Sequence, residues 1–444
     1  MARMTATSSL AGSRAGVSSR IQSLIATLRT DRAALQAHVA SLVVGVALLF
    51  FLDRHRWFLW DEWYFFATLH PWFQAGDWKD FLFAPYVSHW VTIPNLLWEA
   101  AFRIGGTRHY WVYLVAPLSA HLGVVALVRV IMRRVGVGPW LATILSLLVL
   151  LTGVGAGNLE FGWQIQFTGA VFFGLAQLVI SDHDGPVDWR DFAGLGLGAL
   201  GLMFSAVSLA MVAMVGINLA LRSRWRAAAI AVLPLAAAFI AWYLLIGHAG
   251  TPRQPYFQLA ALPQFVWIGV AATLDGLTGI GGAAAVLLIG TILLAIRLNL
   301  LPRQPRYSVP WAMAAGAILF FLEVGYGRIG AGTGYATGSR YLYIGVVCFL
   351  PLMAMVVARY LESTPARWAF AGFLAWAMIT NLGSLYLEIH LNTERGQNIR
   401  DIVLALANNP SLDSMDGSKA IDAPGALYLT VGVVQRMHRQ GDLP

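Results

Sequence analysis

Two adjacent carboxylates, Asp61 and Glu62, lie in an aromatic run that extends from residue 57 to residue 66. An apolar setting tends to raise the pKa of a carboxyl group, which suits a general base. In a helix, adjacent residues point about 100° apart, so only one of the pair can face a given pocket. We therefore predict a catalytic carboxylate here and favour Asp61, with Glu62 as its rival. The alternative is that both acids are solvated residues at a membrane interface.

A histidine, His89, follows in the same segment. Its imidazole is predicted to take part in catalysis by binding a phosphate, orienting Asp61 or sharing its proton, although a single histidine can equally be a structural hydrogen-bonding group. Seven of the 17 tryptophans, Trp63 among them, lie between residues 57 and 98. Indole rings suit contact with sugar rings as well as anchoring at lipid headgroups. The segment therefore predicts a catalytic centre beside a carbohydrate-binding cleft.

Polar side chains also join two apolar stretches near residue 160. We predict that a hydroxyl-rich substrate contacts Asn158, Glu160, Trp163, Gln164 and Gln166. Polar groups at membrane depth are costly unless they line a cavity or pair with one another. Hydrogen bonding between helices is the alternative explanation.

A glycine-rich segment between residues 325 and 338 leads into the start of a predicted helix. Backbone N–H groups of such a loop, the positive end of the helix and two guanidinium groups together favour an anion. We predict a site for the phosphate of a lipid-linked donor, made by Arg328, Ser339, Arg340 and Tyr341. The alternative is that the two arginines contact headgroups and that Glu323 pairs with one of them.

The composition decides what kind of protein must position these groups. The chain has 444 residues, of which 58% are hydrophobic and only 12% are charged. Soluble domains carry about 25% charged residues, so the chain is predicted to be a polytopic α-helical membrane protein. The net charge of +8 comes from arginines between apolar runs, which is typical of membrane topology and not of nucleic-acid binding. One cysteine, Cys348, excludes an internal disulfide framework and a cysteine zinc site.

Apolar stretches of about 20 residues predict the membrane spans. A glycine-rich stretch at residues 192–221 is predicted to be a hairpin of two short helices, which brings the expected number of transmembrane helices to about 11. The single spans are expected at residues 33–52, 110–132, 139–156, 164–181, 227–247, 281–297, 308–326, 341–360 and 367–388. The apolar part of residues 248–280 is expected to lie in the interface or to re-enter the membrane.

Arginine-bearing connections follow alternate spans, so they are predicted to lie together on the cytoplasmic side of the plasma membrane. In this topology, residues 1–32 form a cytoplasmic disordered tail and residues 33–390 form the transmembrane domain. Residues 53–109 are its first outer loop, with interfacial helices and the acidic motif. Residues 391–444 form a short extracytoplasmic tail, with a helix predicted at residues 394–408 before Pro410.

At these motifs the sequence resembles the GT-C superfamily of integral-membrane glycosyltransferases, and more narrowly its actinobacterial-type members. The likeness covers roughly residues 33–390 and depends on Asp61–Glu62, on Ser88–Trp90, on the polar residues near 160 and on the later arginines. It implies a polyprenyl-phosphate sugar as donor, an outer-loop acid as base and a lipid or glycan of the cell envelope as acceptor. Because the chain lacks the large C-terminal domain of many members, acceptor recognition is expected from loops or from another protein.

We therefore predict an inverting glycosyltransferase that works on the outer face of the membrane, among membrane lipids and without nucleic acid. A divalent metal stays open, since no metal ligand set stands out. A transporter or flippase for a lipid-linked saccharide is the alternative, because the same polar groups would suit it. A non-catalytic scaffold of the cell envelope is a third hypothesis.

Overall fold

The computed structural model describes residues 30–250 and 256–443. Helices make up 77% of the structure and strands 1%, so the predicted all-α class is confirmed. The predicted disordered tail lies almost entirely outside the described residues. The first helix, α2 (Asp31–Leu52), begins two residues before the predicted start of the first span. At its start the Thr30 hydroxyl accepts the Ala33 N–H at 3.1 Å.

Eight helical segments in the described residues are long and apolar enough to cross a membrane. They contain α2 together with α6 (Trp111–Arg134), α9 (Ile165–Ser181), α12 (Trp225–Leu245), α13 (Leu262–Thr278), α15 (Ser308–Arg328), α16 (Ser339–Val357) and α17 (Thr364–Ala407). Shorter helices lie among them, namely α7 (Pro139–Leu150), α10 (Trp189–Leu202), α11 (Val207–Leu221) and α14 (Ala284–Arg297). The predicted hairpin at residues 192–221 is thus the pair α10 and α11, and the total of about 11 crossings stays a prediction.

Two segments differ from the sequence-based expectation. The apolar part of residues 248–280 is α13, part of a helical segment long and apolar enough to cross a membrane, and it packs against α15, α16 and α17. Close packing explains this position, since Gly269 and Gly276 leave room for Phe321 and Val154. The last predicted span is also longer than expected, because α17 continues for 44 residues and absorbs the helix predicted at residues 394–408.

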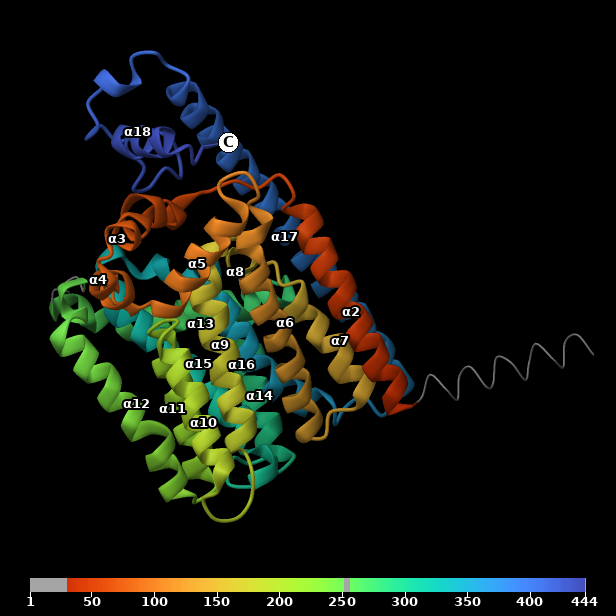
Figure 1. Ribbon diagram of the computed structural model, residues 1–444. Coiled ribbons are helices and arrows are strands. Elements are labelled where there is room, and N and C mark those ends of the chain that lie inside the picture. The colour runs from red at the N-terminus through yellow and green to blue at the C-terminus, as the bar shows by residue number, and fades with distance from the viewer. Residues whose placement is uncertain (1–29, 251–255, 444) are drawn as a thin grey trace, which may run out of the picture.

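The arginine-bearing connections meet at one end of the bundle, which we call the arginine end (the lower end in Figure 1). Arg222 donates to the Pro305 carbonyl at 2.9 Å, and Arg359 donates to the Tyr307 hydroxyl at 3.2 Å. These contacts join connections that are distant in the sequence. The structure thus brings these connections together at one end of the bundle, and their cytoplasmic location stays a prediction.

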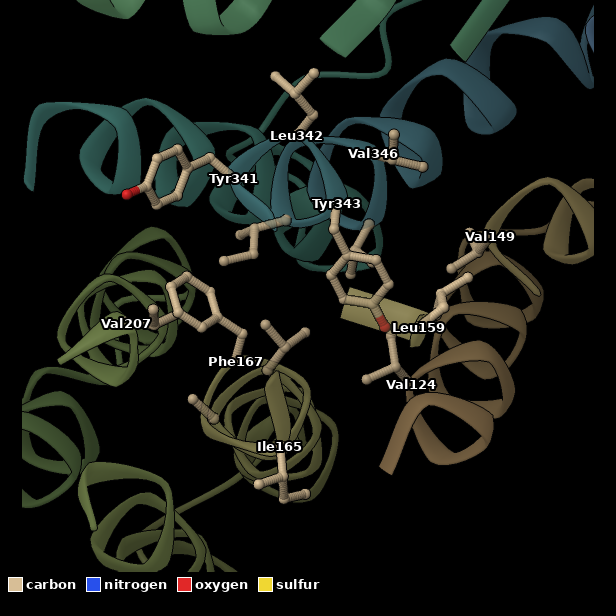
Figure 2. Packing of buried hydrophobic residues seen from close by; sticks show 14 of the residues in the cluster. Val124, Val149, Leu159, Ile165, Phe167, Val207, Tyr341, Leu342, Tyr343 and Val346 are labelled. Carbon is tan, nitrogen blue, oxygen red and sulfur yellow. The ribbon is translucent and has the colours of Figure 1, made fainter. Parts of the chain in front are cut away.

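Helix α16 forms the centre of the core. Every residue from Tyr341 to Leu352 is buried, as expected of a helix that is apolar on all faces. Figure 2 shows Tyr343 of α16 extending toward Leu159 and Val124, while Tyr341 points to another side of α16. The Tyr341 ring lies 6.1 Å from the Phe167 ring of α9, measured between centroids. The Tyr343 hydroxyl meets His121 Nδ1 at 2.9 Å, so the polar end of this buried ring has a partner.

The opposite end of the bundle, which we call the cavity end, carries the first outer loop. Short elements build this loop: η1 (Trp60–Glu62), η2 (Phe65–Leu69), α3 (His70–Ala75), α4 (Trp78–Phe83), the hairpin strands β1 (Pro85–Tyr86) and β2 (His89–Trp90), and α5 (Thr92–Gly105). Interleaved aromatic rings pack them into a buried layer; Phe58, for example, contacts Trp63, Phe66 and Tyr110 edge-on. The predicted interfacial helices are therefore present.

Further short elements complete the cavity end and its surroundings. They are α8 (Gly157–Glu160), η3 (Gly162–Gln164), η4 (Gly247–Gly250), η5 (Tyr256–Ala261), η7 (Ile329–Ala331), η8 (Thr333–Thr337), η9 (Leu412–Ser414) and α18 (Val431–Gln440). One more short element, η6 (Pro305–Tyr307), lies at the arginine end.

Residues 408–443, which we call the C-terminal segment, fold back over the first outer loop (Figure 1, top). Gly425 accepts the Trp60 N–H at 2.7 Å, and Arg436 donates to the Phe66 carbonyl. The Thr107 hydroxyl donates to the carbonyl of Asp442. The predicted short tail is thus a packed cover of the outer loop.

Candidate functional site

A cavity of about 500 Å³ lies at the cavity end, between the first outer loop, the residues before α16 and the C-terminal segment. Its walls come from parts of the chain that are far apart in sequence. They include Trp60, Asp61, Phe161, Trp163, Gln164, Tyr335, Ser339, Arg340, Tyr341, Glu388 and Leu427. Two smaller hollows continue from the cavity, and we call the one of about 200 Å³ the first hollow and the one of about 240 Å³ the second hollow. Arg328, His89 and Tyr341 line both of them.

Asp61 stands at the junction of the cavity and the first hollow. The left-handed backbone of Trp60, with φ of 56°, turns the short helix η1 so that Asp61 faces inward to this junction. An Asp61 carboxylate oxygen lies 3.6 Å from an Arg340 guanidinium nitrogen. Tyr86 shares a hydrogen bond with the same carboxylate, and burial together with the charge of Asp61 raises the pKa of Tyr86, so its hydroxyl stays a donor.

Glu62 also borders the cavity, but it is only 1% exposed and its carboxylate is held by interior hydrogen-bond donors. Its carboxylate accepts the Tyr110 hydroxyl at 2.6 Å and the N–H groups of Gly162 at 3.0 Å and Leu59 at 2.9 Å. Burial raises the pKa of Glu62 to about 7, although Arg56 and these hydrogen bonds oppose the rise. Both Glu62 oxygens therefore accept hydrogen bonds in the interior, whereas the Asp61 carboxylate stands at the junction of the cavity and the first hollow.

Glu160 forms a buried ion pair with Arg56. Its carboxylate lies 3.2 Å from Arg56, and both side chains are completely inaccessible to solvent. Asn392 of α17 donates to Glu160 at 2.8 Å and to Glu388 at 3.2 Å. Asp53 and Glu62 also lie close enough to attract the Arg56 guanidinium electrostatically. Together with Glu160, three acids therefore surround this one cation. Glu160 therefore ties the first outer loop to α17 and does not reach the cavity.

His89 lines both smaller hollows, next to Arg328. Its Nδ1 accepts the Ala206 N–H at 3.3 Å and lies 3.2 Å from the Ser205 hydroxyl. Burial, with Arg328 and Arg340 nearby, lowers the pKa of His89 to about 3. A neutral ring whose Nδ1 accepts a backbone N–H carries its proton on Nε2, so His89 can donate a hydrogen bond but cannot act as a cation near neutral pH.

The predicted phosphate-binding residues come together around the first hollow and the adjoining cavity wall. Arg328, Arg340 and Tyr341 line the hollow, and Ser339 stands beside them at the start of α16. Arg340 also donates to the Tyr335 hydroxyl at 2.9 Å and lies over the Tyr341 ring. In the described part of the chain, Arg328 makes no ion pair. The hollow thus presents two guanidinium groups against one carboxylate, which favours an anion.

Other predicted substrate-binding residues divide into two groups. Trp163 and Gln164 line the cavity, and Gln166 lines the first hollow. Trp63 and Asn158 are completely buried, and Asn158 donates to the Arg340 carbonyl at 2.8 Å. Asn158 therefore holds the start of α16, while the predicted contact of Trp63, Asn158 and Glu160 with substrate has no support from their positions.

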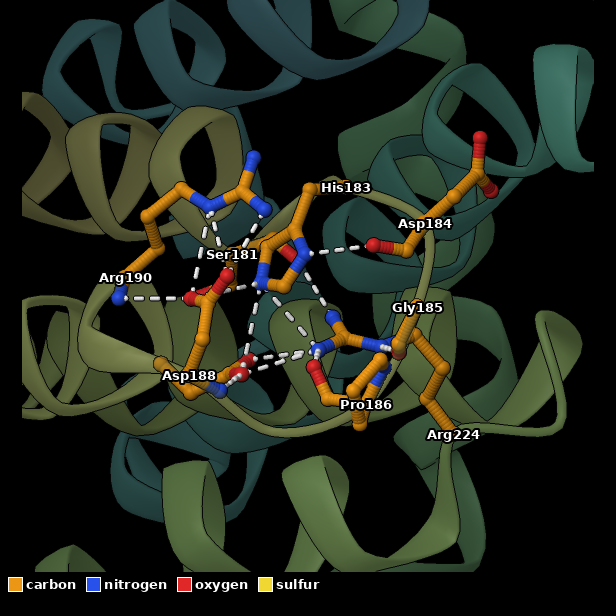
Figure 3. Close-up of polar contacts among 9 residues, drawn as sticks. Ser181, His183, Asp184, Gly185, Pro186, Asp188, Arg190 and Arg224 are labelled. Carbon is orange, nitrogen blue, oxygen red and sulfur yellow. Dashed lines mark hydrogen bonds and ion pairs between the residues drawn. The ribbon is translucent and has the colours of Figure 1, made fainter.

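One cluster with the composition of a metal site lies at the arginine end, far from the cavity. It is the only group of three or more potential ligands among the described residues, and consists of His183, Asp188 and Asp191. Figure 3 shows Arg190 bonded to Asp188 and Arg224 bonded to His183. Arg224 bonds Asp191 at 2.8 Å and Arg190 bonds Asp188 at 2.8 Å. The cluster therefore joins the α9–α10 connection to the start of α12 through ion pairs.

Comparisons place this architecture among known folds. No protein-family model matches the sequence, and no curated protein matches it. The crystal structure of ArnT from Cupriavidus metallidurans bound to undecaprenyl phosphate has a TM-score of 0.54 and 13% identity, over 90% of this chain and 84% of ArnT. The Archaeoglobus fulgidus oligosaccharyltransferase, tethered with an acceptor peptide, has a TM-score of 0.51 and 13% identity, over 85% of this chain and 58% of that protein.

The fold is the GT-C fold. Both similar structures are membrane glycosyltransferases, and the match covers nearly the whole of this chain. The predicted GT-C-like architecture is therefore confirmed, whereas the narrower likeness to actinobacterial-type members stays a prediction.

Several residues of this candidate site were not predicted from the sequence. Tyr86, Tyr335, Glu388, Leu427 and Tyr428 all line the cavity or its first hollow. A carboxylate in a predicted span was a visible signal for Glu388, because such groups usually face a cavity or a partner. Leu427 and Tyr428 gave no such signal, since a leucine and a tyrosine in a short terminal segment are unremarkable until the chain folds back.

Proposed function

We propose that the protein is an inverting glycosyltransferase that moves a sugar from a polyprenyl-phosphate donor to a hydroxyl group of a cell-envelope acceptor. The observation that carries the proposal is the approach of Asp61 to Arg340, within 3.6 Å, at the junction of a cavity with an arginine-lined hollow. A base and an anion-binding group are the two parts that a single displacement at a sugar phosphate needs. The fold, shared with a protein bound to undecaprenyl phosphate, supports a lipid-linked donor.

The donor's phosphate fits the first hollow, against Arg328, Arg340, Ser339 and Tyr341. The second hollow extends from there between α11, α12 and α15, toward Tyr326, which is 62% exposed on the outer surface of the helix bundle. A polyprenyl chain entering along this side would keep its apolar part among membrane lipids while its phosphate reaches the arginines. His89 donates a hydrogen bond from Nε2 to the same phosphate.

The reaction then follows from these positions. The acceptor hydroxyl oxygen attacks the anomeric carbon as the bond from that carbon to the phosphate oxygen breaks, and Asp61 takes the hydroxyl proton. The polyprenyl phosphate leaves with a charge that Arg328 and Arg340 already balance, which lowers the barrier. One displacement inverts the anomeric configuration. No step of this reaction uses ATP, because the donor bond itself supplies the driving force.

The test is sugar transfer by the purified protein, measured with a panel of radiolabelled polyprenyl-phosphate sugars and cell-envelope lipids. We expect Asp61→Asn to lower turnover by about 10²–10⁴-fold, the usual contribution of a general base. Asp80→Asn, an exposed acid in the same outer loop, is the matched control and should keep wild-type turnover. Full turnover in Asp61→Asn, or translocation of the lipid-linked sugar without bond formation, would contradict the proposal and favour a transporter.

A further inference from the structure

The cavity has an apolar, aromatic wall that solvent can reach. Trp60 is 40% exposed and Leu427 is 48% exposed, although both belong to well-packed segments. Tyr335, at 37% exposure, stands on the same cavity. Rigid aromatic faces of this kind provide large contact area and pack against the apolar faces of pyranose rings.

A carboxylate on α17 completes the cavity. The Asn392 side-chain amide donates a hydrogen bond to Oε1 of Glu388 at 3.2 Å. The same amide also donates to the buried Glu160 carboxylate at 2.8 Å. Among the described residues, Oε2 of Glu388 has no hydrogen-bond partner. An ionised carboxylate can only accept hydrogen bonds, and neighbouring sugar hydroxyls are well spaced to donate to it. The cavity therefore offers acceptors for hydroxyl groups beside an aromatic platform.

The charges of the cavity also select among ligands. Asp61, Glu62 and Glu388 all line it, and among the described residues Arg340 is the one basic side chain on its wall. Arg340 is already engaged with Asp61 and, in the proposed reaction, with the donor phosphate. An anionic acceptor group would meet Glu388 without a cation of its own, which like-charge repulsion disfavours.

We propose that this cavity is the acceptor subsite and that it binds an uncharged saccharide, whose hydroxyl groups donate to Glu388 and whose ring packs on Trp60 and Leu427. The inference deepens the proposed function and rests on it. It also makes the C-terminal segment part of substrate selection, because Leu427 comes from that segment. Acceptor recognition thus needs no separate carbohydrate-binding domain.

Binding of saccharide probes tests the inference without any turnover. Saturation-transfer NMR on the full-length protein in nanodiscs would use methyl glucoside, methyl galactoside and methyl mannoside as neutral probes and glucuronate as the anionic one. We expect at least one neutral probe to receive saturation on its ring protons, with glucuronate at least about fivefold weaker. Removing a hydrogen bond to a charged group costs about tenfold or more in affinity, so Glu388→Gln should weaken the neutral probe by that factor.

Matched variants separate a lost subsite from a damaged fold. Glu394→Gln changes another acid of α17, which is exposed and pairs with His390, and should bind the neutral probe like the wild type. Leu427→Ala removes part of the exposed wall and should weaken the same probe by several-fold. Wild-type binding in Glu388→Gln, equal binding of glucuronate, or no neutral probe bound by the wild type would each overturn the inference. A protein that binds the saccharide but transfers no sugar from any donor would refute the proposed function and leave the saccharide site standing.

Discussion

At the scale of single residues, two adjacent acids in the same aromatic run have opposite surroundings. Asp61 faces the cavity, where Arg340 and Tyr86 contact it. Glu62 is buried behind it, where three protein donors saturate its carboxylate. The pair therefore divides into a residue whose carboxylate faces the cavity and a residue whose carboxylate bonds the turn on which the first one stands.

Glu62 makes the stability of the protein depend on pH. Burial raises its pKa from 4.5 to about 7, so folding favours the protonated acid. The stabilisation of the folded state by protonated Glu62 is complete below about pH 4.5 and is lost as the pH rises through 7. The free energy of unfolding lost in this way amounts to about 3 kcal/mol. Glu62→Gln cannot ionise, so we expect its free energy of unfolding to fall less between pH 5 and pH 8 than that of the wild type, by about 1–3 kcal/mol.

Unfolding of both proteins by SDS titration in mixed micelles, at several pH values, measures this difference. Glu394→Gln is the control, since that acid is exposed and should leave the wild-type slope in place. At low pH, Glu62→Gln should be less stable than the wild type by about 1–2 kcal/mol, because the amide nitrogen cannot accept the Leu59 N–H. Identical pH slopes in the two proteins would show that Glu62 does not titrate in this range.

At the scale of elements, the C-terminal segment and the turn that carries Asp61 stabilise each other. Gly425 accepts the Trp60 N–H, and its own backbone has a φ of +92°, which L side chains rarely adopt. A Cβ at this position would also collide with the Leu59 side chain. One glycine therefore permits the close contact that brings Leu427 and Tyr428 to the cavity.

We expect Gly425→Ala to destabilise the C-terminal segment by about 1–3 kcal/mol, because it combines backbone strain with a steric clash. The expected signs are faster proteolysis of the segment and a several-fold loss of transfer activity, measured on the same preparation. Gly281→Ala is the control, since that glycine has open space around its Cβ position and no left-handed φ. Equal protease resistance of both variants and the wild type would argue against the contact.

At the scale of the whole molecule, exposed tryptophans and the arginine-bearing connections lie together at one end of the bundle. Trp189, Trp225 and Trp368 are 67–75% exposed, and each stands at the start of a helix at the arginine end. Exposed tryptophans typically lie at the membrane interface, and arginine-rich connections typically lie on the cytoplasmic side. We therefore propose that the cavity end faces the exterior, together with the C-terminal segment.

Labelling of single added cysteines by a membrane-impermeant maleimide tests this orientation. Ser418→Cys lies on the exposed C-terminal segment and should react in intact cells, whereas Pro186→Cys in the exposed α9–α10 connection should react only after permeabilisation. The native Cys348 is buried and should give little background labelling. Labelling of the protein without an added cysteine measures this background. The reverse pattern of labelling would place the cavity on the cytoplasmic side and exclude an outer-face reaction.

Local sequence features determined the class of the protein and part of its site. Long apolar runs can be stable only inside a membrane, so the helical architecture followed from composition and spacing. The turn acid Asp61, the paired arginines Arg328 and Arg340, and Gln164 were predicted from residue type and setting, and all of them line the cavity or its first hollow.

Tertiary structure alone decided which polar groups face the cavity and which pair in the interior. The Arg56–Glu160 ion pair joins residues 104 positions apart, and Glu388 reaches the cavity from a helix that begins beyond residue 360. Such contacts depend on the packing angles of whole helices, which residue type and spacing do not specify. For the same reason, the return of the C-terminal segment over Asp61 became visible only in the folded chain, since the contact depends on a backbone N–H and one glycine.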